Sequence, residues 1–343
     1  MRVANIEPGI IIWDVDGVLI DVRDSYRRTI VKTVQNYFSN FIGLGLKDEL
    51  MKIEDTQKFK LASGFNDDWE LAYAAVLCYL AVLVDGIDKK KLRKWNSDEK
   101  PEKIEQMVLR LHELGKLCGN NNPEVDISEL TDRIGKNGGG LDGTEKTLSY
   151  ILGENLNIAK KFWFPELIKR VFEEIYLGID LFEKKYGEPA RFVHNEGLIR
   201  NERAMVELKT LIEIRRRYYF GIATGRERFE TEFSLNENRI GRIFDKRTIV
   251  CSDDVKKKKP DPAPLIECRN RVLRRYGLGK NSPVIYVGDS IDDLKAARNA
   301  NFYFAGVLGA IPNPDERNKL REKLHDMHSD IIVDDILELT IYI

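Results

Sequence analysis

The sequence predicts an α/β protein with a doubly wound, Rossmann-like parallel sheet and a large, mostly α-helical domain inserted after the first strand. Three observations predict this fold. Short apolar runs at 9–13, 218–223 and 284–287 each end in a turn of polar residues. Continuous apolar runs of this length are typical of strands that are buried on both faces of a parallel sheet. Helical patterns lie between the runs, and strands that alternate with helices favour a doubly wound sheet.

The first apolar run, 9–13, predicts a buried strand, and Asp14-Val15-Asp16-Gly17 follows it directly. After residue 21 the apolar residues take on helical spacing, which continues to about residue 193. Two stretches show this best, each with its apolar residues on one face: Tyr26, Ile30, Val34 and Tyr37, then Leu167, Ile168, Val171, Phe172 and Ile175. We therefore expect a core of residues 1–20 and 195–343 and a helical second domain of residues 21–194.

The most apolar part of the predicted helical domain is Trp69–Val84, which is broken chiefly by Glu70. This stretch is shorter than the roughly 18–20 residues that span a bilayer, and aspartates flank it on both sides. We expect a buried helix with no membrane role, at which two copies could meet as a homodimer. Further along, the glycine-rich segment Gly138–Gly143 predicts a flexible loop, either a mobile linker or a lid beside a phosphate.

The remaining elements alternate along the second half of the chain. A helix is predicted at 202–214, with Ala204, Leu208, Leu211 and Ile212 on one side, and the strand at 218–223 follows it. Further strands are expected near 248–251, 302–307 and 331–333, and a helix at 291–300 opens with acidic residues. Ligands of such a sheet bind outside the carboxyl ends of the strands, so the three polar turns should meet in one crevice.

The composition excludes several classes of function. Hydrophobic residues make up 43% of the 343 residues, enough for a sizeable core. The 55 lysines and arginines nearly balance the 56 aspartates and glutamates, which argues against a nucleic-acid or anionic-membrane surface. The four cysteines are scattered and predict neither a zinc site nor disulfides. The first apolar run follows Glu7 and Pro8 without a basic segment, so we expect no signal peptide and a cytoplasmic location.

Asp14 and Asp16 are the first candidates for chemistry, because both can face the crevice once the chain leaves the pleated strand. A carboxylate attacks phosphorus when a divalent cation offsets the repulsion between the two negative groups. The neighbouring carboxyl group, when protonated, can donate to the leaving oxygen and then act as base toward water. The alternative is that Asp-x-Asp-Gly is simply a turn.

Asp289 and Asp293 are candidates for a magnesium site. Mg²⁺ prefers hard oxygen ligands and needs only one or two carboxylates besides a substrate phosphate. Asp289 ends a predicted strand and could share the ion with Asp14, and Asp293, a turn later, could hold a bound water. The alternative is that these aspartates begin the next helix, where the helix dipole favours negative charge.

Thr224 and Gly225 offer a hydroxyl and approachable backbone N–H groups to a phosphoryl oxygen. A plain strand-to-helix turn is the alternative. Lys259 ends a lysine run and precedes Pro260, which fixes its backbone as extended. Its ammonium could offset the crowding of carboxylates and phosphate, whereas Lys256–Lys258 fit a solvated surface.

Taken in this order, four motifs resemble those of the haloacid dehalogenase superfamily: Asp14-Val15-Asp16-Gly17-Val18, Thr224-Gly225, Lys259-Pro260 and Gly288-Asp289-Ser290-Ile291-Asp292-Asp293. The resemblance covers about residues 1–20 and 195–343. The insertion after the first motif looks like the helical cap of phosphoglycolate phosphatases and beta-phosphoglucomutases. It is much larger than is usual for such caps, so a named substrate does not transfer from the resemblance.

The resemblance implies a role for each motif. Asp14 would be the nucleophile and a magnesium ligand, and Asp16 the general acid/base, with its backbone carbonyl on the ion. Thr224 would hold the phosphoryl group and Lys259 would steady it. Asp289 would bind Mg²⁺, and Asp293 would support the site from behind.

The sequence therefore predicts a Mg²⁺-dependent phosphatase that acts on a small phosphorylated metabolite, such as phosphoglycolate. A phosphomutase of beta-phosphoglucomutase type is the alternative enzyme, and a partner-binding protein on a degenerate core is the non-enzymatic alternative. Dehalogenation is disfavoured, because it needs no acid where Asp16 stands. Candidates for substrate binding within the cap are Arg23, Arg27, Asn66, Asp67 and the Gly138–Gly143 segment, although Asn66-Asp67-Asp68 could instead cap the following helix.

Overall fold

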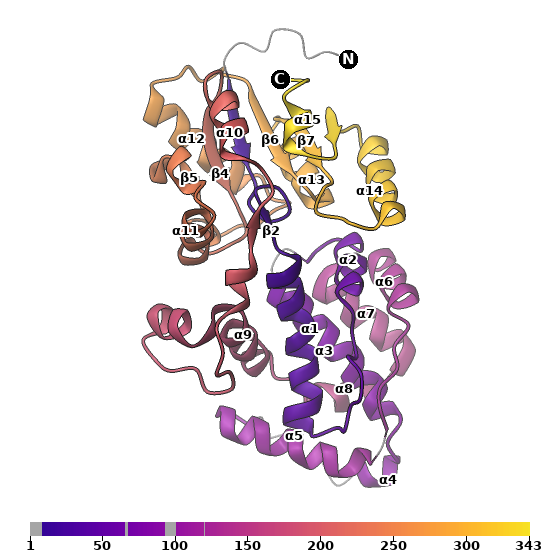
Figure 1. Ribbon diagram of the computed structural model, residues 1–343. Coiled ribbons are helices and arrows are strands. Elements are labelled where there is room, and N and C mark those ends of the chain that lie inside the picture. The colour runs from indigo at the N-terminus through magenta and orange to yellow at the C-terminus, as the bar shows by residue number, and fades with distance from the viewer. Residues whose placement is uncertain (1–8, 66–67, 93–100, 120) are drawn as a thin grey trace. The chain divides into compact units, whose positions relative to one another are not determined.

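The computed structural model describes residues 9–65, 68–92, 101–119 and 121–343 of the protein, and Asn66 and Asp67 therefore lie outside the described residues. The chain divides into two compact units, each with its own core (Figure 1). Unit 1 comprises Met1–Asp24 and Ile199–Ile343, and unit 2 comprises Ser25–Leu198. The chain thus leaves unit 1 after Asp24 and returns to it after Leu198, where the sequence analysis had expected residues 20 and 194.

Unit 1 is built on a six-stranded parallel sheet with the strand order β5-β4-β1-β6-β7-β8. The strands are β1 (Ile10–Trp13), β4 (Tyr219–Ala223), β5 (Ile249–Val250), β6 (Val284–Gly288), β7 (Tyr303–Val307) and β8 (Ile331–Val333). Every residue of β1 and β6 is buried, as the continuous apolar runs predicted. The doubly wound α/β prediction is confirmed.

Helices cover the sheet of unit 1. They are α10 (Leu208–Arg215), α11 (Arg228–Glu237), α12 (Ala263–Tyr276), α13 (Ile291–Asn299), α14 (Pro314–Asp326) and α15 (Ile336–Leu339). Helix α12 packs on β4 and β5, and α13 packs on β6 and β7. The start of α13 is fixed by Ser290, whose hydroxyl accepts a hydrogen bond from the backbone N–H of Asp293 at 3.2 Å. The helix predicted at 291–300 is confirmed.

The helix predicted at 202–214 is wrong in its first half. Residues Arg203–Ala204 form the short strand β3, which pairs antiparallel with β2 (Ile20–Asp21), and α10 begins only at Leu208. Pairing with β2 holds Arg203–Ala204 in an extended conformation, and the backbone N–H of Ala204 also donates to the side chain of Asn238 at 2.7 Å. The apolar residues at 204 and 212 that suggested a longer helix are both exposed.

Unit 2 is helical, and its described residues contain no strand. A π-helical turn, η1 (Arg23–Arg27), leads into α1 (Arg28–Asn36) and a second π-helical segment, η2 (Tyr37–Ile42). The following helices are α2 (Ile53–Leu61), α3 (Asp68–Asp85), α4 (Lys89–Leu92), α5 (Ile104–Cys118), α6 (Ile127–Lys136), α7 (Gly140–Leu152), α8 (Asn155–Lys160) and α9 (Pro165–Tyr186). The two apolar faces predicted for this part of the chain, one from Tyr26 to Tyr37 and one from Leu167 to Ile175, are buried.

Helix α3 contains the apolar stretch Trp69–Val84 and is the centre of unit 2. It packs against α1, α7, α8 and α9, and nearly all of its apolar side chains are buried. The buried helix predicted here is confirmed, and its apolar character is explained within one chain without a second copy. Among the described residues, no helix combines the length and apolarity needed to cross a membrane.

The flexible loop predicted at Gly138–Gly143 is wrong, because residues from Gly140 onward form the first turn of α7. This segment contacts another backbone closely: the N–H of Gly140 donates to the carbonyl of Ser63 at 2.9 Å. A β-carbon on Gly64 would lie 2.7 Å from the nitrogen of Gly140. The glycines therefore allow two chain segments to pack backbone to backbone, rather than giving a mobile loop.

Candidate functional site

Three predicted site residues are brought together by the order of the strands. Asp14, Thr224 and Asp289 follow β1, β4 and β6, and β1 lies between β4 and β6 in the sheet. The backbone N–H of Asp14 donates to the carbonyl of Val287 at 2.9 Å, which continues the β1–β6 pairing into the turn. Since the strands are parallel, their carboxyl ends meet at one edge of the sheet, as the sequence predicted.

Lys259 lies at the centre of this edge and bridges two aspartates. Its Nζ lies 2.7 Å from Oδ2 of Asp14 and 2.7 Å from Oδ1 of Asp293. All three side chains are at least nine-tenths buried. The lysine is separated from both aspartates in sequence, so only the fold brings this charge between them. Lys259 therefore differs from Lys256–Lys258, which are all exposed, in the way the sequence predicted.

The electrostatics of this group follow from burial and from the three charges. Burial raises the pKa of Asp14 above its ordinary value, although Lys259 acts against this shift and Asp293 adds to it. Burial alone would lower the pKa of Lys259, but the two aspartates outweigh burial and raise it well above its ordinary value. Burial would raise the pKa of Asp293, but Lys259 and several hydrogen bonds outweigh burial and lower it. Lys259 is therefore an ammonium at neutral pH.

Tyr286 belongs to the same group and was missed by the sequence analysis. Its hydroxyl oxygen lies 2.9 Å from Nζ of Lys259 and 3.1 Å from Oδ1 of Asp293. Burial raises the pKa of Tyr286 well above its ordinary value, and the negative charges of Asp14 and Asp293 add to the shift. A polar hydroxyl in the otherwise aliphatic run Val284–Val287 was the available signal, since a buried tyrosine hydroxyl needs a partner.

Asp293 uses both carboxylate oxygens as hydrogen-bond acceptors. Besides Lys259 and Tyr286 on Oδ1, its Oδ2 accepts from the N–H of Asp289 at 3.2 Å and from the N–H and hydroxyl of Ser290 at 3.1 and 2.7 Å. The side chain packs directly over Gly288, where an added β-carbon would lie 2.7 Å from its Cγ. Asp293 thus fixes both Lys259 and the turn that carries Asp289.

Asp14, Asp289 and Asp293 form a group whose ligand oxygens all lie within 4.8 Å of one another. Three carboxylates held this close against the single ammonium of Lys259 leave excess negative charge, which a divalent cation would offset. All the donors are hard oxygens, which suits Mg²⁺ better than a softer metal. The residues present therefore fit the predicted magnesium site.

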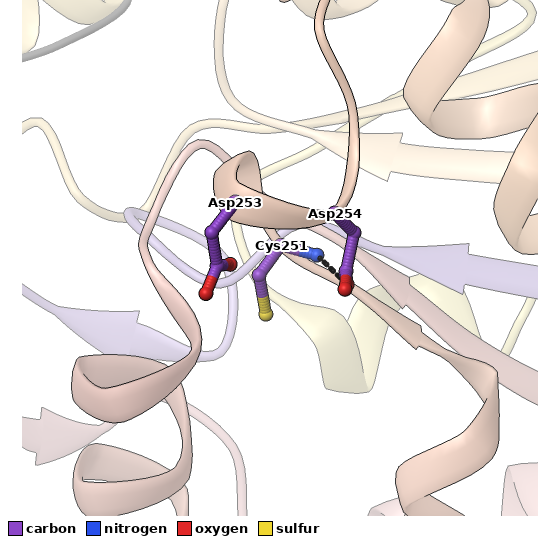
Figure 2. A group of neighbouring side chains, drawn as sticks. All are labelled: Cys251, Asp253 and Asp254. Carbon is purple, nitrogen blue, oxygen red and sulfur yellow. Dashed lines mark hydrogen bonds between the residues drawn. The ribbon is translucent and has the colours of Figure 1, made fainter.

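A second group of described residues, Cys251, Asp253 and Asp254, also has ligand atoms close together (Figure 2). Asp254 is already committed: its Oδ2 accepts from the N–H of Cys251 at 2.9 Å and from Arg228 at 2.5 Å and Arg271 at 3.3 Å. Burial raises the pKa of the Cys251 thiol to about 12, and a thiol must lose its proton to bind a metal. This group is a structural turn at the end of β5.

Asp16 lies two residues after Asp14 and makes a different set of contacts. Its side chain is 23% exposed and pairs with Nε of Arg226. Arg226 is itself buried and is held from its other side by Glu202, with NH1 and NH2 at 2.9 and 3.0 Å from the two carboxylate oxygens. The sequence analysis assigned no role to Arg226 or Glu202, because their partners are distant in sequence.

Thr224 is buried at the end of β4, and its backbone N–H donates to the carbonyl of Val250 at 3.1 Å. Its hydroxyl oxygen accepts from the N–H of Arg226 at 3.3 Å, which closes the turn around the half-buried Gly225. Arg23, a substrate candidate, is held by Asp21, with Nε 3.0 Å from both carboxylate oxygens. Its charge is therefore already neutralised within unit 1.

The profile of haloacid dehalogenase-like hydrolases matches residues 204–307, which includes the turns after β4 and β6 and Lys259 but not the turn after β1. Pyrophosphatase PpaX of Bacillus velezensis is 35% identical over 125 residues, which cover 35% of this chain and 55% of that protein. A probable phosphoglycolate phosphatase of Pseudomonas savastanoi is 34% identical over 114 residues, which cover 30% of this chain and 67% of that protein.

The chain thus spans between about half and two thirds of the length of these two relatives. An X-ray structure from the Northeast Structural Genomics Consortium superposes on 97% of this chain and 97% of that one, with a TM-score of 0.66 and 20% sequence identity. At this level of identity the likeness shows a shared fold.

Proposed function

The chain belongs to the haloacid dehalogenase-like hydrolases, and from this membership we propose that it is a magnesium-dependent phosphatase that works through an aspartyl-phosphate on Asp14. The observation that carries the proposal is the bridge of Lys259 between Asp14 and Asp293, at the edge where Thr224 and Asp289 also lie. An ammonium between two buried carboxylates, beside a third, is an arrangement suited to an incoming phosphate with its cation.

Asp14 is the proposed nucleophile. Its Oδ2 is held by Lys259, and its Oδ1 accepts from the backbone N–H of Val15 at 2.8 Å, so the carboxylate is fixed in direction. One carboxylate oxygen attacks phosphorus, and the bond from phosphorus to the ester oxygen breaks. Thr224 and the backbone at Gly225 bind the phosphoryl oxygens, and Lys259 offsets their charge.

Asp16 is the proposed general acid and base. It donates a proton to the departing ester oxygen in the first step. In the second step it takes a proton from the water that attacks phosphorus, which releases inorganic phosphate and restores the Asp14 carboxylate. The two aspartates thus divide the work of nucleophile and acid, and both lie in the turn after β1.

Asp14, Asp289 and the backbone carbonyl of Asp16 are the proposed magnesium ligands, with Asp293 behind them. When bound, Mg²⁺ would neutralise part of the charge on the phosphoryl group and on Asp14. Each carboxylate oxygen of Asp293 already accepts two or more hydrogen bonds, whereas each oxygen of Asp14 accepts one, so the proposed part of Asp293 in the metal site is to hold the turn that carries Asp289.

The proposed substrate is a small phosphorylated metabolite, and unit 2 is proposed to select it as the cap domain. The relatives are named for pyrophosphate and phosphoglycolate hydrolysis, which makes these two compounds the first to test. The most informative assay is phosphate release from a panel that contains both compounds and several sugar phosphates. Isomerisation of a sugar phosphate without phosphate release would assign a mutase instead.

The mechanism is tested by one pair of variants. Purified protein should release phosphate from p-nitrophenyl phosphate with Mg²⁺ and should stop when EDTA is added. Asp14→Asn should lower kcat by roughly 10³-fold or more, whereas Asp253→Asn, which changes an exposed aspartate after β5, should keep wild-type activity. Acid-quenched wild-type enzyme should carry phosphate on the peptide that contains Asp14. Full activity of Asp14→Asn would overturn the proposal.

A further inference from the structure

Arg226 lies between two carboxylates in the core of unit 1. Its side chain is 1% exposed, its Nε donates to Oδ1 of Asp16, and its two terminal nitrogens face Glu202. Of the two carboxylates, the side chain of Asp16 is 23% exposed and that of Glu202 is fully buried. The guanidinium therefore links the buried carboxylate of Glu202 to the partly exposed carboxylate of Asp16.

Glu202 holds the guanidinium in a single orientation. Its two oxygens accept from NH1 and NH2 of Arg226 at 2.9 and 3.0 Å, which is the two-pronged pairing that a planar guanidinium makes with a carboxylate. Ser234 fixes the pair further, since its hydroxyl donates to Glu202 and its oxygen lies 2.8 Å from NH1 of Arg226. Both terminal nitrogens of Arg226 thus donate to Glu202, and its Nε donates to Asp16.

The backbone of Arg226 is fixed as firmly as its side chain. Its N–H donates to the hydroxyl oxygen of Thr224 at 3.3 Å, and its carbonyl accepts from the N–H of Ser252 at 2.9 Å. Glu202 lies beside β3, which pairs with β2, and β2 follows the turn that carries Asp16. The geometry thus ties Asp16 to the rest of unit 1 both through the chain and through Arg226.

We propose that Arg226 is a positioning residue that aims Asp16 at the leaving oxygen of the substrate, with Glu202 as its anchor; this inference rests on the proposed function. Such positioning matters because a general acid must lie within hydrogen-bond reach of the atom it protonates. In this arrangement Arg226 differs from an arginine that binds phosphate, which would present its terminal nitrogens to the substrate. Although Arg226 follows Thr224 and Gly225 directly in sequence, its terminal nitrogens are hydrogen-bonded to Glu202.

The test compares two substrates whose leaving groups differ in their need for a proton. An alkyl oxygen leaves poorly unless it is protonated, whereas p-nitrophenolate leaves without help, so misplacing the acid should affect mainly the alkyl ester. Arg226→Lys keeps a positive charge for Glu202 but lacks the two-pronged geometry. We expect it to lower kcat/KM for glycerol phosphate by roughly 30-fold and for p-nitrophenyl phosphate by about 3-fold or less. Glu202→Gln should show the same imbalance, to a smaller degree.

A double-mutant comparison makes the test specific to Asp16. In the Asp16→Asn background the acid is absent, so adding Arg226→Lys should leave the ratio of the two kcat/KM values unchanged. Equal losses on both substrates in the otherwise wild-type protein would show that Arg226 binds phosphate or acts only on folding, and a changed ratio in the Asp16→Asn background would show that it acts without Asp16; either result would overturn the inference. Circular dichroism melting curves identify any variant that fails to fold. If Arg226→Lys fails to fold, Glu202→Gln, in which the new side chain has the same shape as the old one, takes its place.

Failure of this inference is distinguishable from failure of the proposed function. If the wild type releases phosphate with Mg²⁺ and Asp14→Asn does not, the proposed function holds whatever the arginine variants show. If those variants then lose activity equally on both esters, only the positioning role fails. A wild type without any phosphatase activity would instead remove the proposed function and, with it, the inference built on Asp16.

Discussion

Gly17 and Asp289 lie so close together that a β-carbon at position 17 would overlap the carboxylate of Asp289. Gly17 also has a φ of +72°, a backbone conformation that other residues rarely adopt. The glycine of the Asp-x-Asp-Gly turn thus makes room for a carboxylate from a neighbouring strand end, in addition to allowing the turn itself. Its absence of a side chain is part of the proposed metal site.

Gly17→Ala should therefore weaken the metal site as well as the fold. The added methyl group displaces Asp289, and we expect the Mg²⁺ concentration for half-maximal activity to rise roughly tenfold and the free energy of unfolding to fall by about 1–2 kcal/mol. Magnesium titrations of phosphatase activity measure the first effect. Gly279→Ala is the matched control, since a β-carbon there meets nothing within 4 Å. An unchanged magnesium requirement in Gly17→Ala would contradict the assignment of Asp289.

Lys259→Met should destabilise unit 1, because it leaves the buried carboxylates of Asp14 and Asp293 without their cation. We expect a loss of about 3–5 kcal/mol in the free energy of unfolding. Without the ammonium, burial should hold the folded-state pKa of both aspartates above that of the unfolded chain, so the variant should regain stability as the pH falls and the aspartates take up protons. The deficit relative to wild type should thus be smaller near pH 5 than near pH 8. Denaturant unfolding at both pH values, with Lys256→Met as control, measures this; a deficit that grows at acidic pH would speak against the ion pairs.

Tyr286→Phe removes the hydroxyl that contacts both Lys259 and Asp293 and leaves the ring in the core. We expect a loss of about 1–2 kcal/mol in stability, because the buried partners lose a hydrogen bond. The activity should fall less than in Lys259→Met, since the ammonium itself stays. Unfolding curves and kcat on p-nitrophenyl phosphate measure both effects, and a variant as stable as wild type would show that the hydroxyl has no structural role.

Gly140→Ala should destabilise unit 2, although the sequence suggested a tolerant loop there. The new β-carbon would lie 2.7 Å from the carbonyl oxygen of Gly64, so two backbones would have to separate. We expect a loss of about 2–3 kcal/mol from the clash and the positive φ together. Gly138→Ala has a positive φ but nothing within 4 Å, and it should cost only about 1 kcal/mol. Equal costs at both positions would contradict the close packing.

Arg27→Met should stabilise the protein. Arg27 is 5% exposed, and its Nε has no hydrogen-bond partner among the described residues. Replacing a poorly satisfied buried cation with an apolar side chain of similar length should raise the free energy of unfolding by about 1 kcal/mol. Denaturant unfolding curves measure this gain, and a variant less stable than the wild type would contradict the prediction. Arg28→Met, which removes a half-exposed partner of Glu49, is the control.

The parallel sheet could be predicted because its strands are buried on both faces. Such strands read as continuous apolar runs, and β1, β4 and β6 each stand out in this way. The catalytic candidates followed because each comes directly after one of these strands or, for Lys259, beside a proline. Position along a strand is local information, and the sequence carries it.

The rest of the site depends on pairings between distant positions. Glu202 lay in an apparent helix because its neighbours have helical spacing, whereas its carboxylate pairs with Arg226. Tyr286 fits a strand pattern whether or not its hydroxyl has a partner. The glycines near Gly140 were misread because a glycine needed for close packing looks the same in sequence as one that gives flexibility.

The pairing of β2 with β3 allows the length of the insertion to vary. Asp21 and Arg203, on the outgoing and returning legs of the chain, are direct partners in that pairing. The pairing therefore holds the two ends of the insertion together, in the way that the two strands of a hairpin hold the ends of its loop. Because the entropy of closing a loop grows only with the logarithm of its length, lengthening or shortening the insertion costs unit 1 little. An insertion attached in this way can be exchanged for one of a different size while the sheet keeps its stability.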